Sequence, residues 1–239
     1  MNNALTVVYA IVALLELTAE FVNSSALLTG GEPILNAQLL RMTTKPLLMI
    51  VLIALFVISA NKDFKLRNLL VVAFGFSWLG DVALMLTHIN ENFFLAGLAS
   101  FLVTHILYIV AFVKTGNLNT GFLKRTPLAA APLLLYFITL IFWLYPNIQA
   151  DMKIPVVIYS VTIALMVLAA MNNFGNVSKA VFLSSFSGAL LFMISDSIIA
   201  INKFISPVAF AGVLIMVLYI SGQYFIAKGF VALSKENKP

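Results

Sequence analysis

The chain has 239 residues, of which 62% are hydrophobic and 10% are charged, and its mean hydropathy is +1.05. A soluble domain of this size cannot bury so much apolar surface in one core, so the composition predicts an integral membrane protein. The apolar runs are continuous rather than alternating, which excludes a transmembrane β-barrel. Cysteine is absent, which excludes disulfides and thiolate chemistry. The net charge of +5 is spread over the predicted loops and does not indicate a nucleic-acid surface.

The hydropathy pattern predicts an all-α, polytopic fold with eight transmembrane helices in one bundle and a single domain, because each span needs about 20 residues. The predicted spans cover residues 4–22, 45–60, 69–87, 93–114, 127–145, 154–171, 179–201 and 207–233. The first apolar run follows no basic segment, so we expect a first span there rather than a signal peptide.

The connection between the first two spans, residues 23–44, is the longest one predicted. It contains a Gly-Gly turn signal, and we expect a short surface helix over residues 34–41. The pair Lys45-Pro46 is expected to open the second span, because proline is tolerated in the first turn of a helix.

Lysine and arginine are divided unequally between the two sides of the predicted bundle. Ten of the 14 lie on the side that holds both termini and the loops after the second, fourth and sixth spans. The other four are Arg41, Lys45, Lys153 and Lys203. Because positive charge collects on the cytoplasmic side, both termini are predicted to be cytoplasmic. The expected location is the cell membrane, which is the inner membrane in a bacterium.

Two predicted spans each carry an aspartate deep in apolar sequence. Asp81 lies in FGFSWLGDVALML, and Asp196 lies in GALLFMISDSIIAINKF. A charge in hydrocarbon costs about 2.5–3.5 kcal/mol on insertion scales, so such a residue is expected to be paired or used. At ~1.5 Å per helical residue, the predicted orientation places both aspartates in the outer half of the bilayer.

The residues alone leave three interpretations of this pair open. The aspartates could accept hydrogen bonds that fix helix packing, with Ser184, Gly188 and Ser195 allowing close contacts. They could belong to a transporter or proton relay, although the interrupted helices typical of carriers are not visible in the sequence. They could act as the acid and the base of a hydrolase whose pocket is open to lipid.

Other hydrolytic chemistries fit the sequence less well. The chain has two histidines, His88 and His105, near opposite ends of their spans, so a catalytic zinc site rich in histidine is disfavoured. No G-x-S-x-G element supports a serine triad. We expect His105 to lie beyond the floor of the pocket and to pack against Tyr108, and His88 to be interfacial.

Several segments resemble the YhhN-like lysoplasmalogenase family. They are FSWLGDVALM (76–85), FFLAGLASFLVTHILYIVAF (93–112), GALLFMISDSIIAINKF (188–204), YISGQ (219–223) and the Lys45-Pro46 pair. The resemblance covers residues 45–229 and implies a membrane hydrolase of ether lipid metabolism. Its expected reaction is cleavage of the vinyl ether bond of lysoplasmalogens, which releases a fatty aldehyde and glycerophosphoethanolamine or glycerophosphocholine. Neither a cofactor nor a metal is expected, because one acid and one base suffice.

The resemblance implies that Asp81 and Asp196 are the catalytic pair, and it does not assign which one is the acid. Lys45 and Lys203, near the outer surface, would attract the substrate phosphate. The lipid chain is expected between helices lined by aromatic residues such as Phe74, Phe101 and Phe192. The remaining candidates, for orienting the carboxylates, are Glu16, Asn202, Tyr108, Tyr159, Tyr219 and Gln223.

The expected partners are a lysophospholipid substrate and membrane lipids, with neither a nucleic acid nor a protein partner. The alternative function is that of a non-enzymatic protein that binds or transports lipid in the same cavity. Purified protein of that kind would release no aldehyde.

Overall fold

A computed structural model describes residues 1–32, 34–116 and 120–236. Within these residues, eight helical segments are long and apolar enough to cross a membrane. The α-helices of these segments are α1 (Asn3–Leu28), α2 (Leu35–Ser59), α3 (Arg67–Met85), α4 (Asn92–Thr115), α6 (Ala131–Leu144), α7 (Lys153–Met171), α8 (Lys179–Phe204) and α9 (Ala211–Glu236). The prediction of an all-α, multi-pass membrane protein is therefore confirmed.

Short helical turns extend or connect these helices. The 3-10 turn η1 (Leu86–His88) continues α3, and η2 (Pro127–Ala130) and η3 (Tyr145–Asn147) flank α6. Together, η2, α6 and η3 form the fifth apolar segment, of 21 residues. The one-turn helix α5 (Phe122–Arg125) precedes η2.

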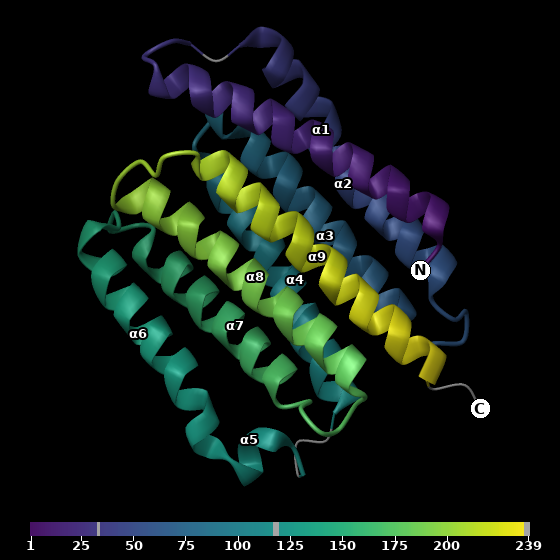
Figure 1. The fold of residues 1–239 in the computed structure, drawn as a ribbon. Coiled ribbons are helices and arrows are strands. Elements are labelled where there is room, and N and C mark those ends of the chain that lie inside the picture. The colour runs from purple at the N-terminus through teal and green to yellow at the C-terminus, as the bar shows by residue number, and fades with distance from the viewer. Residues whose placement is uncertain (33, 117–119, 237–239) are drawn as a thin grey trace.

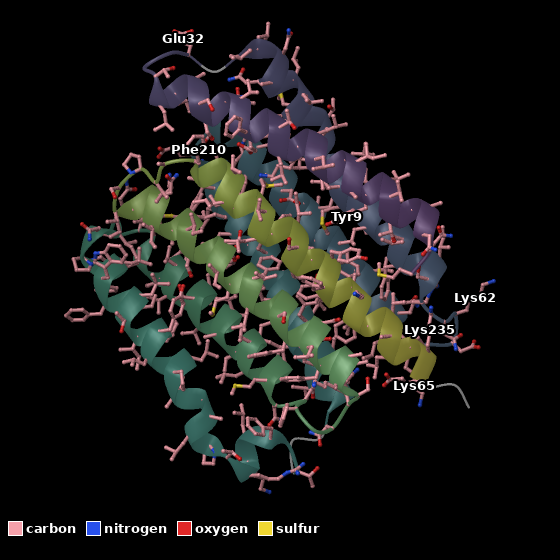
Figure 2. The ribbon with its side chains drawn as sticks, viewed as in Figure 1. Tyr9, Glu32, Lys62, Lys65, Phe210 and Lys235 are labelled. Carbon is pink, nitrogen blue, oxygen red and sulfur yellow. The ribbon has the colours of Figure 1, made fainter. Side chains whose placement is uncertain are left out.

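The helices lie alongside one another, with α1 and α6 at opposite edges of the bundle (Figure 1). The start of α1 and the end of α9 lie at one end of the bundle, where Lys62, Lys65 and Lys235 also lie (Figure 2). Glu32 and Phe210 lie at the other end. The cytoplasmic assignment of the basic end stays a prediction, and Lys238, which contributed to the charge count, lies outside the described residues.

Helices α8 and α9 are packed closely because small residues face each other along their contact. A Cβ atom added at Gly188 would lie 2.7 Å from the Gly222 carbonyl oxygen, and one added at Gly229 would overlap the Ser185 hydroxyl. Such contacts let the two backbones approach without intervening side chains. Gly188 therefore packs as the sequence indicates, whereas Ser185, rather than Ser184, meets α9. The close approach fixes α8, which carries Asp196, against α9, which carries Tyr219.

The connection between α1 and α2 is shorter than predicted. Helix α1 continues to Leu28, and Gly30, with φ of 76°, follows its C-terminal cap. Helix α2 then begins at Leu35 and runs without a break through Pro46, so the predicted surface helix is the first part of a membrane-spanning one. Proline inside a helix removes one backbone hydrogen bond, a loss that membrane helices tolerate. The prediction that Pro46 opens this span is therefore wrong.

Helix α6 is attached loosely to the bundle. Of its residues only Leu144 is buried, and the Phe142 side chain is 81% exposed. Its links to the interior include the Tyr136 hydroxyl, which donates to Ser197 Oγ at 2.8 Å, and a small cluster that Leu144 forms with Ile148 and Val156. The apolar face of α6 is thus directed mainly to the surroundings, as expected of a helix in contact with lipid.

Candidate active site

Asp196 lies on α8, where α4 and α7 approach. The Tyr159 hydroxyl, from α7, donates a hydrogen bond to Asp196 Oδ2. The same oxygen lies 3.9 Å from Nε2 of His105, on α4. The preceding residue, Ser195, points the other way and donates to the Ile215 carbonyl of α9 at 3.0 Å. Side chains from α4 and α7 therefore surround the Asp196 carboxyl group, and α9 holds the residue before it.

Asp81 lies on α3 and is 2% exposed. Its Oδ2 atom accepts a hydrogen bond of 2.6 Å from the hydroxyl of Tyr219, on α9. The small residue before it, Gly80, leaves room for the Phe101 ring, because a Cβ atom there would lie 2.6 Å from that ring. Each aspartate is thus bonded to a tyrosine from a different helix.

A cluster of aromatic rings connects the surroundings of the two aspartates. The rings of Phe101, Phe192 and Tyr219 meet edge to face, with centroid distances of 5.4–5.9 Å. Phe192 also packs against His105, at a centroid distance of 4.8 Å. Tyr219, beside Asp81, and His105, beside Asp196, therefore contact the same phenylalanine. Edge-to-face packing favours one fixed arrangement of these rings.

Other sequence candidates make hydrogen bonds away from both aspartates. The Tyr108 hydroxyl donates to Gln223 Oε1 at 2.6 Å, and Gln223 Nε2 donates to Ser77 Oγ at 2.9 Å. The Asn202 side chain accepts from the backbone N–H of Val208 at 2.9 Å. Of the six residues proposed to orient the carboxylates, the structure brings Tyr159 and Tyr219 into contact with them.

Glu16 lies buried between α1 and α2, not in contact with either aspartate. It accepts a hydrogen bond of 2.5 Å from the Thr44 hydroxyl, and its other oxygen has no hydrogen-bond partner among the described residues. The neighbouring Lys45 is buried as well, at 7% exposure. Because Lys45 directly follows Thr44, a buried cation lies near the Glu16 carboxyl group on the α1–α2 side of the bundle.

Two adjoining cavities open beside these residues. The apolar slot, of about 60 Å³, lies among α4, α6, α7 and α8, and both Asp196 and Tyr159 line it. The polar cavity, of about 830 Å³, lies at the end of the bundle where α1 meets α2 and α8 meets α9. Leu84, Phe94 and Ile199 line both cavities, so the two spaces meet at these side chains.

The polar cavity carries several charged side chains. It is lined by Lys45, Lys203 and the ion pair in which Arg41 Nε lies 2.8 Å from Glu20 Oε1. The Lys203 ammonium lies over the Phe94 ring, 4.8 Å from its centroid. Three cations against one carboxylate favour an anionic ligand group in this space.

The aromatic lining differs from the prediction. Phe101 lines the slot, but Phe74 and Phe192 are fully buried in the core and do not line it. Other phenylalanines line the slot in their place, namely Phe94, Phe137 and Phe204. The reason is that Phe74 and Phe192 face other helices. Helical periodicity shows which residues share a face but not which neighbouring helix that face contacts.

His105 is the residue of this site that the sequence prediction missed. It lies against Tyr159 and Phe192 and near Asp196, not against Tyr108 beyond the pocket. The signal available in the sequence was its spacing, because His105 lies four residues after Phe101 and shares its buried helical face. His88 lies at the end of η1, where its Nδ1 is 2.8 Å from the Met85 carbonyl oxygen. Within the described ranges, no group of three or more histidine or acidic side chains is arranged to hold a metal ion.

The apolar helices define a multi-pass membrane protein with one aspartate, Asp81, buried in its bundle and a second, Asp196, on the wall of an apolar slot. The chain belongs to the YhhN family, whose sequence model matches residues 40–230. The resemblance identified in the sequence is thereby confirmed.

Curated relatives of the chain are named lysoplasmalogenases. The chain is 34% identical over 167 residues to lysoplasmalogenase TMEM86A of Homo sapiens, a match that covers 68% of this chain and 63% of that protein. It is 33% identical over 160 residues to lysoplasmalogenase TMEM86A of Bos taurus, covering 65% and 62%, respectively. It is 32% identical over 146 residues to lysoplasmalogenase TMEM86B of Sus scrofa, covering 61% and 57%. The chain thus spans about three fifths of the length of these relatives. No solved structure matches it.

Proposed function

We propose that this protein is a membrane hydrolase that cleaves the vinyl ether bond of lysoplasmalogens. The relatives' shared name supports this substrate. The structural observation that carries the proposal is that Asp196 lines an apolar slot that adjoins a cavity lined by cations. A lysophospholipid has the same two parts, an apolar chain and a head group with a phosphate.

The substrate placement follows from this match. The phosphate lies in the polar cavity, where Lys45 and Lys203 attract it as point charges, and Asn202 supports the rim. The alkenyl chain lies in the slot, among α4, α6, α7 and α8. The vinyl ether, which joins the chain to the glycerol, then falls where the cavities meet, within reach of Asp196.

The chemistry requires one acid and one base. The acid transfers its proton to the second carbon of the alkenyl group, the double bond supplies the electron pair of the new C–H bond, and an oxocarbenium ion forms. Water adds to the first carbon while a carboxylate takes the proton that the water loses. The resulting hemiacetal transfers its hydroxyl proton, through the carboxyl groups, to the glycerol oxygen as the C–O bond breaks. The products are a fatty aldehyde and the glycerophospho head group, with one water consumed.

Asp81 and Asp196 are the carboxyl groups of this scheme. The hydrogen bonds from Tyr219 and Tyr159 orient them, and the shared aromatic cluster holds them in one environment. Reaction in such an enclosed site protects the oxocarbenium ion from competing reactions with bulk solvent.

The test is aldehyde release from a 1-alkenyl lysophospholipid by the purified protein in detergent. We expect turnover by the parent and loss of turnover in Asp81→Asn and Asp196→Asn, which keep the size of each side chain. Asp63→Asn, at an exposed loop position, is the matched control and should stay active. Thermal unfolding of each variant shows whether it is folded. A folded parent protein that binds the lipid but releases no aldehyde would replace the hydrolase with the lipid-binding alternative.

A further inference from the structure

His105 is a fully buried side chain whose polar atoms are unused. Its exposed fraction is 0%, and neither ring nitrogen has a hydrogen-bond partner among the described residues. Buried polar side chains are nearly always hydrogen-bonded, so an imidazole with two unpaired nitrogens requires an explanation. Packing alone would be served by an apolar ring at this position.

The ring of His105 is held in one orientation by its neighbours. Tyr159 and Phe192 meet it edge to face, at centroid distances of 5.1 and 4.8 Å. This packing leaves Nε2 at 3.9 Å from Asp196 Oδ2, just beyond hydrogen-bond distance. The titratable groups that contact this ring from the neighbouring helices are Asp196 and Tyr159. A shift of about 1 Å would therefore turn the contact into an N–H···O hydrogen bond.

We propose that Asp196 is the acid of the reaction and that His105 is the positioning residue that stabilises it after proton transfer. The inference rests on the proposed function. In the resting protein His105 carries its proton on Nε2 and makes no bond with the protonated Asp196. When the Asp196 O–H bond breaks and its proton joins the alkenyl carbon, the new carboxylate draws in the Nε2–H group. The histidine keeps its proton throughout and donates it only as a hydrogen bond.

This arrangement favours the transition state over the bound substrate. A hydrogen bond that forms only as negative charge develops lowers the barrier without tightening substrate binding. A donor to an ionised acceptor also makes a stronger bond than a donor to a neutral one. The unpaired state of His105 is thus explained, because its partner is the carboxylate that forms during the reaction.

The surroundings of Asp81 indicate that it is the base rather than the acid. Its carboxyl group is 2% exposed and accepts a hydrogen bond of 2.6 Å from the Tyr219 hydroxyl. It lines neither the slot nor the polar cavity, whereas Asp196 lines the slot. Asp196 is therefore the group that meets the alkenyl carbon, and Asp81 takes the role of the base.

Two substitutions at position 105 separate hydrogen bonding from packing. His105→Gln keeps a donor near the position of Nε2, and His105→Phe keeps a ring but has no donor. We expect His105→Phe to lower kcat about 100- to 1,000-fold, the scale found for one donor to a developing oxyanion, with KM changed less than about twofold. His105→Gln should recover most of kcat. His88→Gln, at the other histidine, should behave as wild type. Equal kcat in the two position-105 variants, or a loss confined to KM, would overturn the inference.

A second measurement needs no turnover and so separates this inference from the proposed function. In protein with nitrogen-15-labelled histidine, the His105 Nε2–H proton signal should move downfield as Asp196 is ionised by raising the pH. The movement should be absent in Asp196→Asn, while the His88 signal behaves alike in both proteins. A His105 signal that stays in place, or that moves equally in Asp196→Asn, would refute the pairing even if the wild type releases aldehyde.

Discussion

Replacing Tyr219 with phenylalanine tests how strongly the hydrogen bond to Asp81 supports turnover. The substitution removes one hydroxyl group and leaves the ring, with its edge-to-face contacts to Phe101 and Phe192. The lost hydrogen bond is 2.6 Å long and its acceptor is a buried carboxyl group. The change is therefore confined to one donor.

The magnitude follows from the nature of the acceptor. A hydrogen bond to a charged group contributes about 1.5–3 kcal/mol. At 1.36 kcal/mol for each factor of ten, its loss lowers kcat/KM about 10- to 150-fold if Asp81 reacts as a carboxylate. We expect a value in this range for Tyr219→Phe.

Tyr108→Phe is the matched control. Its hydroxyl is buried too and donates at the same distance of 2.6 Å, but the acceptor is the Gln223 amide. A neutral hydrogen bond contributes about 0.5–1.5 kcal/mol, so stability should fall slightly while kcat/KM changes less than about threefold.

The assay is aldehyde release at several substrate concentrations, with thermal unfolding measured on the same preparations. If Tyr108→Phe loses as much kcat/KM as Tyr219→Phe, the hydroxyl of Tyr219 has no special relation to the reaction. Asp81 would then have no direct role in the reaction.

Two further substitutions test the packing and the polar cavity. Gly188→Ala should lower the free energy of unfolding by about 1–3 kcal/mol, because the added Cβ would lie 2.7 Å from backbone atoms of α9. Gly75→Ala is the control. A Cβ added there would have no atom within 4 Å, so the unfolding temperature should be unchanged or higher. An unchanged unfolding temperature in Gly188→Ala would contradict the close α8–α9 contact. Lys45→Gln should raise KM about tenfold through loss of one charged contact with the phosphate, while Lys62→Gln, at the opposite end of the bundle, should not. Equal KM values in the two lysine variants would argue against a head-group site in the polar cavity.

The helices could be predicted because hydropathy is a local property of the sequence. The largest difference is at the start of α2, where Gln38 and Arg41 lower the hydropathy but do not interrupt the backbone hydrogen bonds. A helix continues for as long as its backbone is satisfied, so its length can exceed its apolar part. The same reason explains why Pro46 marks no boundary.

The two aspartates could be identified because a charged residue in apolar sequence is conspicuous. Their partners could not, because Tyr219 and Asp81 are 138 residues apart and meet only through the rotation of α3 and α9 about their axes. Tyr108 also lies in an apolar stretch of sequence and yet bonds to Gln223. His105 was missed for the same reason, since only the placement of α7 and α8 brings Tyr159 and Asp196 to its ring.

The loose attachment of α6 has a kinetic consequence for the proposed reaction. The slot of about 60 Å³ is smaller than the ~150 Å³ cavity that admits benzene, so an alkenyl chain enters only when a wall moves. Since only Leu144 of α6 is buried, we expect α6 to be the wall that moves, opening sideways into the lipid. The proposed substrate would then arrive by lateral diffusion, and the rate should follow the mole fraction of substrate in the micelle or bilayer. Added inert detergent should slow the reaction at constant total substrate, as surface dilution does for enzymes that draw their substrates from a membrane.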